Sequence, residues 1–388
     1  MIVDSIIFQL SLIIISAAIL GTLFLYGKQP IIIAYIAAGV LIGPGGYQLI
    51  KHTEQVQQFS HIGIILLLFL IGLNLQPSKI PRLIKTTSAL TVGTAIVFAV
   101  ASLGFALLMQ FTVDSALIFS AAMMFSSTVI ALKLIPTTTL HHKRKGELMT
   151  GVLLIQDILA ILVILFISGD QAQSTLAVFF ILLAKFIGLW LLSVIGVKYI
   201  MTPLLMKFDV VQEYTFVATL AWCLLWAEGA YLLGLSYELG AFVAGLSIAS
   251  CRVALIIAEH LKPLREFFLI LFFFAVGAEL NFNIELNLLL AAIAFGVLIV
   301  PLKALVFQKA FRWSGESPEI SRELAVRLSQ SSEFSLLVAF SALSMGLLTK
   351  DSAMILQIAT ITSFVVSTYW VVLKYPTTIS SNARLNQD

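Results

Sequence analysis

The chain has 388 residues, of which 60% are hydrophobic and only 11% are charged. Because a soluble domain usually carries about 25% charged residues, this composition excludes a water-soluble protein and predicts that lipid covers most of the surface. The net charge of +3 gives no reason to expect nucleic acid as a partner. The two cysteines, Cys223 and Cys251, form neither a disulfide framework nor a metal-ligand spacing.

Apolar segments long enough to cross a bilayer recur along the whole chain. Thirteen spans are predicted, at 5–25, 30–49, 59–76, 87–109, 115–135, 148–168, 175–201, 213–234, 236–251, 264–281, 287–308, 324–346 and 352–373. The first follows Asp4 rather than a basic segment, so we interpret it as a span and not as a cleaved signal peptide. The predicted fold class is an all-α polytopic membrane protein.

Lysine and arginine alternate between the connections of these spans. The odd-numbered connections carry Lys28; Lys79, Arg82 and Lys85; Lys143, Arg144 and Lys145; Lys207; Arg252, Lys262 and Arg265; and Lys309, Arg312 and Arg322. The even-numbered connections carry only Lys51 and Lys350. Basic loops stay on the cytoplasmic side, so we expect the N-terminus outside and the C-terminus in the cytoplasm.

The sequence also repeats itself. Gly72 aligns with Gly277, 205 residues later, and Ser126 aligns with Ser331 at the same offset. The segment 34–43 resembles 239–248 at almost the same distance. A single connecting helix is predicted at 175–206, between two halves of six helices each. Because it crosses the membrane once, the two halves have opposite orientations. This inverted-topology repeat is the plan of many secondary transporters.

Two spans contain polar clusters near their centres. Ser126, Ser127 and Thr128 interrupt the fifth, and Ser331, Ser332 and Glu333 interrupt the twelfth. We predict that both helices break and cross there, so that freed carbonyls and half-helix dipoles can receive a cation. The side chains of both clusters, together with Gln156 and Asp157 of the sixth span, are the predicted cation- and proton-binding groups. The alternative is that these hydroxyls bond back to their own helices or join neighbouring helices.

The most informative single residue is Asp157, in the middle of the apolar segment 147–168 and beside Gln156. A carboxylate at that depth costs roughly 2.5–3.5 kcal/mol on insertion scales. Its mirror position, Ile361-Thr362, is uncharged, so the charged site is single. A buried carboxylate is either protonated or paired with a cation, which predicts exchange of a monovalent cation for a proton at Asp157. A structural ion pair is the alternative.

Two cationic residues, Lys303 and Arg327, lie in the predicted spans that accompany this carboxylate. Lys303 lies within the eleventh span and could pair with Asp157 or Glu333. Equally, its side chain could extend to the cytoplasmic face. Arg327 lies near the start of the twelfth span, where we expect an interfacial position.

The sequence resembles the monovalent cation:proton antiporter-2 family, and within it the Kef-type potassium/proton exchangers. The matching stretches are AYIAAGVLIGPGGY, HIGIILLLFLIGLNLQP, FSSTVIALKLI, LLIQDILAI, LGAFVAGLSIA, FFLILFFFAVGAELNF and SQSSEFSLLV. The resemblance implies a homodimer whose transmembrane domain, 1–373, contains a dimer part (1–86 and 213–281) and a core that moves as an elevator (87–168 and 287–373). It implies K⁺, or Na⁺, at Asp157, with no resident cofactor.

The same resemblance implies the multi-pass location of a bacterial inner membrane. Kef-type exchangers continue into a cytoplasmic nucleotide-binding regulatory domain, whereas residues 374–388 are expected to be a short cytoplasmic tail. The leading hypothesis is therefore a potassium/proton antiporter and not an enzyme. A gated cation channel, a sodium-coupled organic-anion symporter and an intramembrane aspartyl protease are the alternatives. Potassium selectivity rests on the resemblance alone.

Overall fold

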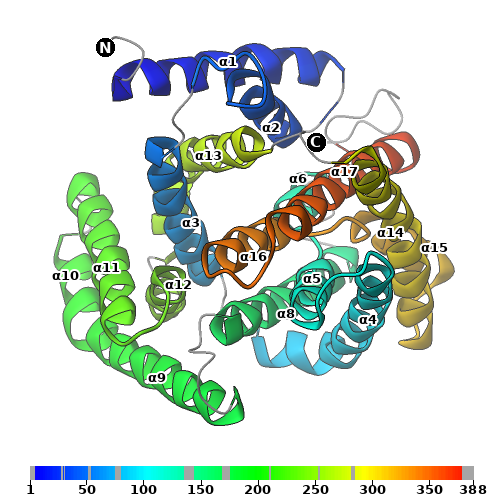
Figure 1. The fold of residues 1–388 in the computed structure, drawn as a ribbon. Coiled ribbons are helices and arrows are strands. Elements are labelled where there is room, and N and C mark those ends of the chain that lie inside the picture. Colours follow the sequence, from blue (N-terminus) through cyan, green and yellow to red (C-terminus); the bar gives the residue numbers. More distant parts are fainter. Residues whose placement is uncertain are drawn as a thin grey trace. The chain divides into compact units, whose positions relative to one another are not determined.

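The structure is a computed structural model, and it describes residues 5–27, 29, 31–50, 54–74, 80–134, 144–167, 175–208, 211–251, 254–280 and 285–377. Every regular element in these ranges is a helix (Figure 1). The contacts divide the chain into two compact units. The first contains Met1–Lys51, Arg82–Ala160 and Val276–Asp388, and the second contains His52–Pro81 and Ile161–Ala275.

The first unit contains the helices that the sequence associates with the site, together with the first two helices of the chain. They are α1 (Ile6–Tyr26), α2 (Ile31–Ile42), most of α4 (Ile80–Leu108), α5 (Val113–Met123), α6 (Thr128–Lys133), most of α8 (Arg144–Ile167), α14 (Leu286–Trp313), α15 (Pro318–Arg327), α16 (Glu333–Ser344) and α17 (Lys350–Lys374). Its apolar core joins α4, α8, α14 and α15, with Phe98 and Phe307 edge to face at 5.0 Å.

The second unit contains the helices of the predicted connector and of part of each half. They are α3 (Glu54–Asn74), α9 (Thr175–Gly196), the π-helix η1 (Val197–Met201), α10 (Thr202–Lys207), α11 (Gln212–Leu232), α12 (Tyr237–Ile248) and most of α13 (Ala254–Glu279). Its core brings α3, η1, α11 and α12 together around Phe69, Met201 and Cys223.

Each predicted span coincides with one helix or with consecutive helices, but the count of thirteen is not confirmed. In the described ranges, seven helices are long and apolar enough to cross a membrane, and five further apolar helices are shorter. The multi-pass, all-helical class is confirmed. The division into dimer and core parts stays a prediction, and the tail beyond residue 377 lies outside the described residues.

The two predicted helix breaks are present, and serine side chains explain where each helix restarts. Residues 124–127 separate α5 from α6, and residues 328–332 separate α15 from α16. Ser127 is the N-cap of α6, and its hydroxyl accepts a hydrogen bond from Ile130 N. Ser332 is the N-cap of α16, where it forms a capping box with Ser335. Such caps satisfy N–H groups that have no partner inside the helix.

The repeat-related glycines both lie at close helix contacts. A Cβ atom on Gly72 would lie 2.8 Å from Leu246 N of α12. A Cβ on Gly277 would lie equally close, at 2.8 Å, to the carbonyl carbon of Ile36 in α2. The segments that form α2 and α12 are the ones that resemble each other in sequence. Glycine is therefore needed at both positions for close approach of two backbones.

Candidate functional site

The two helix breaks are hydrogen-bonded to each other. The Ser126 hydroxyl donates to Leu328 O at 2.7 Å, and Gln330 Nε2 donates to Ser127 O at 3.2 Å. One turn into α16, the Ser335 hydroxyl donates to Ala122 O at 2.7 Å. The predicted meeting of the fifth and twelfth spans at their breaks is thus observed within the first unit.

Asp157 and Gln156 are buried on α8, and each contacts the first break. The exposed fractions of the two side chains are 4% and 1%. The Thr128 hydroxyl lies 3.1 Å from Asp157 Oδ1 and 3.3 Å from Oδ2. The main-chain N–H of Ser126 donates to Gln156 Oε1 at 3.0 Å. Two consecutive side chains therefore hold α8 against the start of α6.

Only one of the two polar atoms of the Gln156 amide is hydrogen-bonded within the described residues. Its oxygen holds Ser126, whereas Nε2 is buried and has no hydrogen-bond partner in the described residues. An amide oxygen has a second lone pair, so it could contact a cation while it still holds the break. Its role as a ligand stays a prediction.

The second break brings Glu333 to the same region. Glu333 is the first residue of α16 and is 3% exposed. It directly follows the second break, which is hydrogen-bonded to the first break, and Thr128 at the first break contacts Asp157. Beside Glu333, the N–H of Ser331 donates to the Ser363 hydroxyl at 2.9 Å, and the Ser331 hydroxyl has no partner among the described residues. Two acidic groups thus share one buried region.

Three of the four serines predicted as cation ligands have hydroxyls with structural contacts in this geometry, and Ser331 is the exception within the described part of the chain. The hydroxyls of Ser127 and Ser332 cap α6 and α16, and the Ser126 hydroxyl donates across to Leu328 O. These contacts agree with the alternative in which hydroxyls join the helices. In contrast, Thr128 contacts a carboxylate directly.

The sequence suggests that Lys303 pairs with a carboxylate or extends to the cytoplasmic face, and its observed contacts are different. It is fully buried on α14, and its ammonium donates to Phe125 O at 2.6 Å and, more weakly, toward Gln330 O at 3.5 Å. It also lies over the Phe98 ring, 5.2 Å from the centroid. Within the described part of the chain its hydrogen bonds go to main-chain oxygens, one from each break, rather than to a carboxylate.

The carbonyls freed by the breaks are therefore largely occupied by protein donors. Phe125 O and Gln330 O receive Lys303, Ser127 O receives Gln330, and Leu328 O receives Ser126. Each carbonyl oxygen has two lone pairs, so these contacts do not exclude a cation, and the expectation that the carbonyls bind one stays a prediction. Of the predicted ligands, the Asp157 carboxylate and the Thr128 hydroxyl contact each other directly.

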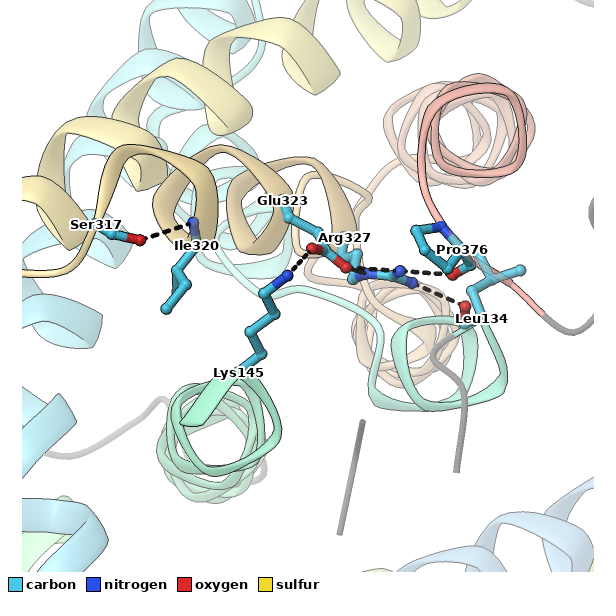
Figure 2. Close-up of polar contacts among 7 residues, drawn as sticks. All are labelled: Leu134, Lys145, Ser317, Ile320, Glu323, Arg327 and Pro376. Carbon is cyan, nitrogen blue, oxygen red and sulfur yellow. Dashed lines mark hydrogen bonds and ion pairs between the residues drawn. The ribbon is translucent and has the colours of Figure 1, made fainter. Parts of the chain in front are cut away.

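Arg327 is the polar residue whose position the sequence does not reveal. It is 1% exposed, and it ion-pairs with Glu323 one turn earlier in α15 (Figure 2). Its expected place at the membrane interface stays a prediction. The spacing of four residues between an acid and a base on one helix is the sequence signal that could have indicated this pair.

Comparison with known proteins identifies a family that matches most of this chain. The family described as sodium/hydrogen exchanger, transmembrane, matches residues 12–374. Similar solved structures include two of the sodium proton antiporter MjNhaP1 from Methanocaldococcus jannaschii. The structure at pH 8 has a TM-score of 0.66 and 16% identity, covering 94% of this chain and 95% of that chain. The electron-microscopy structure has a TM-score of 0.64 and 17% identity, covering 94% of each chain.

Proposed function

Because the chain belongs to the transmembrane sodium/hydrogen exchanger family, which makes it a cation:proton antiporter, we propose that it exchanges potassium for protons at Asp157. The family supports antiport of a monovalent cation against protons. Potassium is the finer part of the proposal. It rests on the likeness of LLIQDILAI and SQSSEFSLLV to the corresponding stretches of Kef-type exchangers.

The observation that carries the proposal is the chemical environment of Asp157. Its carboxylate is 4% exposed, and in the described residues its one hydrogen-bond donor is the neutral Thr128 hydroxyl. An ionised carboxylate without a cationic partner is costly in such surroundings. It is stable either with a proton or with a bound cation, so the two compete for one group. That competition is sufficient for exchange without a separate proton path.

Alternating access is proposed to occur by an elevator movement. The polar groups at Asp157 and at the two breaks lie on α6, α8, α14, α16 and α17 and in the breaks themselves. All of them lie in the parts 87–160 and 287–373 of the predicted core, which belong to one compact unit. A site held within one unit can be carried as a body without losing its ligands. On the resemblance to Kef-type exchangers we expect a homodimer in a bacterial inner membrane. The placement of the basic loops puts the expected N-terminus outside.

The direct test replaces Asp157 in protein reconstituted into liposomes. Asp157→Asn removes the ionisable group with little change of shape, and exchange should be lost in both directions. Asp351→Asn is the matched control, because Asp351 is an exposed carboxylate in the first turn of α17. Proton flux is followed while potassium, sodium and lithium are varied separately. Wild-type exchange by Asp157→Asn would contradict the assignment, and a preference for sodium would contradict only the choice of cation.

A further inference from the structure

Arg327 is buried at the end of α15, immediately before the second break. Its Nε and Nη2 donate to Glu323 Oε1 at 3.0 and 2.9 Å. Nη1 donates to Leu134 O at 2.8 Å, and Nη2 donates also to Pro376 O at 2.7 Å. Figure 2 shows the guanidinium between these three acceptors, which come from different parts of the chain. A planar fork of donors suits such an arrangement, whereas a single ammonium does not.

The contact with Leu134 reaches the helix that carries Thr128. Leu134 is the C-cap of α6, which has only six residues and begins with Thr128. So short a helix is not stable by itself, and its last carbonyls have no partners inside the helix. Arg327 supplies a donor there, and its positive charge is favourable at a helix C-terminus. Arg327 therefore fixes one end of α6, while the other end contacts Asp157.

The remaining contacts reach the other helices of the site. Pro376 follows α17, whose Ser363 and Ser367 hydroxyls contact the second break at Ser331 and Gln330. The second oxygen of Glu323 accepts from Lys145, which lies in the first turn of α8, the helix of Asp157. One buried cluster thus joins the ends of α6, α8, α15 and the segment after α17 (Figure 2).

We propose that Arg327 is a positioning residue for the exchange site, and that it holds α6 so that the Thr128 hydroxyl meets the Asp157 carboxylate. The proposal rests on the proposed function, because it needs Asp157 to bind the cation. It makes cation binding, rather than the maximal rate, the quantity that Arg327 controls. If Arg327 only stabilised the fold, replacing it would leave the affinity of the folded carrier for potassium unchanged.

The first test measures the apparent KM for potassium in proteoliposomes made with folded carrier. Arg327→Gln should raise that KM several-fold and change the maximal rate less. Arg327→Lys keeps the charge but cannot reach three separate acceptors, so an intermediate KM is expected. Arg144→Gln is the matched control, because Arg144 is an exposed cation in the first turn of α8 that pairs with Glu316 and Glu147. Its KM should be that of the wild type.

The second test asks whether Arg327 acts through Thr128. If it does, Arg327→Gln should have no further effect on the KM when Thr128→Val is already present. The proposal would be overturned if each substitution raised the KM independently, so that their two factors multiplied in the double variant. It would also be overturned if Arg327→Gln had the KM of the wild type. If that variant does not fold, Arg327→Lys takes its place in the same cycle. Failure of both to fold would also overturn it, because Arg327 would then support the fold rather than the site.

The outcome is separable from that of the proposed function. If the wild type exchanges potassium and Asp157→Asn does not, the proposed function holds whatever the Arg327 variants do. A readout without transport is the rise in melting temperature caused by potassium chloride, since a ligand that binds only the folded state stabilises it. Arg327→Gln should show a smaller rise than the wild type at the same concentration. An equal rise would contradict the positioning role.

Discussion

Replacing Thr128 by valine removes one hydroxyl and leaves the shape of the side chain nearly unchanged. The hydroxyl lies 3.1 and 3.3 Å from the two oxygens of Asp157, and its single proton can serve one of them at a time. A hydrogen bond to a charged group contributes about 1.5–3 kcal/mol. Because these distances exceed the usual range for O–H···O bonds, we take the lower end. About 1.5 kcal/mol corresponds to roughly a tenfold change in an equilibrium constant.

The hydroxyl favours the ionised carboxylate, which is the form that a cation needs. Thr128→Val should therefore raise the apparent KM for potassium about tenfold, measured as potassium-dependent proton flux in proteoliposomes. Thr128→Ser keeps the hydroxyl and should stay near the wild type. Thr91→Val is the matched control, since the Thr91 hydroxyl is buried but donates only to Thr87 O of its own helix. An unchanged KM in Thr128→Val would refute the role given to this contact.

Two further predictions concern stability. A Cβ atom on Gly245 would meet the main chain of Phe69, so Gly245→Ala should destabilise the protein by about 1–3 kcal/mol, seen as a lower melting temperature in detergent. A Cβ atom on Gly229 would meet no atom within 4 Å, so Gly229→Ala should not lower the melting temperature. Burial by itself would raise the pKa of Glu323. The positive charges of Arg327 and Lys145 outweigh burial and lower this pKa below the ordinary value of a glutamate. Its contribution to stability is therefore present above the unfolded-state pKa and is lost as the pH falls through the folded-state pKa. The melting temperatures of the wild type and Glu323→Gln should converge between about pH 7 and about pH 3, and a constant difference would contradict this.

The helix breaks could be predicted from sequence because their cause is local. Serine and threonine side chains compete for backbone groups and cap new helices. Ser127 and Ser332 do so at 205 residues' separation, where the repeat places them. The helix segments also agree with the apolar pattern. The number of spans is a different matter, because α5 and α16 are shorter than a bilayer crossing and only their combination with α6 and α15 resembles one.

The contacts of the two buried cations with main-chain carbonyls could not be predicted. Lys303 donates to Phe125 O, 178 residues away, and Arg327 donates to Leu134 O, 193 residues away. Main-chain carbonyls are present at every residue, so the sequence does not show which of them will accept. The position of Lys303 within a span suggested carboxylates as its partners, whereas the fold supplies the carbonyls of the two breaks.

The central claim is that a cation and a proton compete for the Asp157 carboxylate. Calorimetric titration of the purified protein with potassium chloride, repeated in buffers of different ionisation enthalpy, measures the protons released for each cation bound. We predict proton release that increases as the pH is lowered, and neither binding nor release in Asp157→Asn. Potassium binding without proton release, or proton release retained by Asp157→Asn, would contradict the claim.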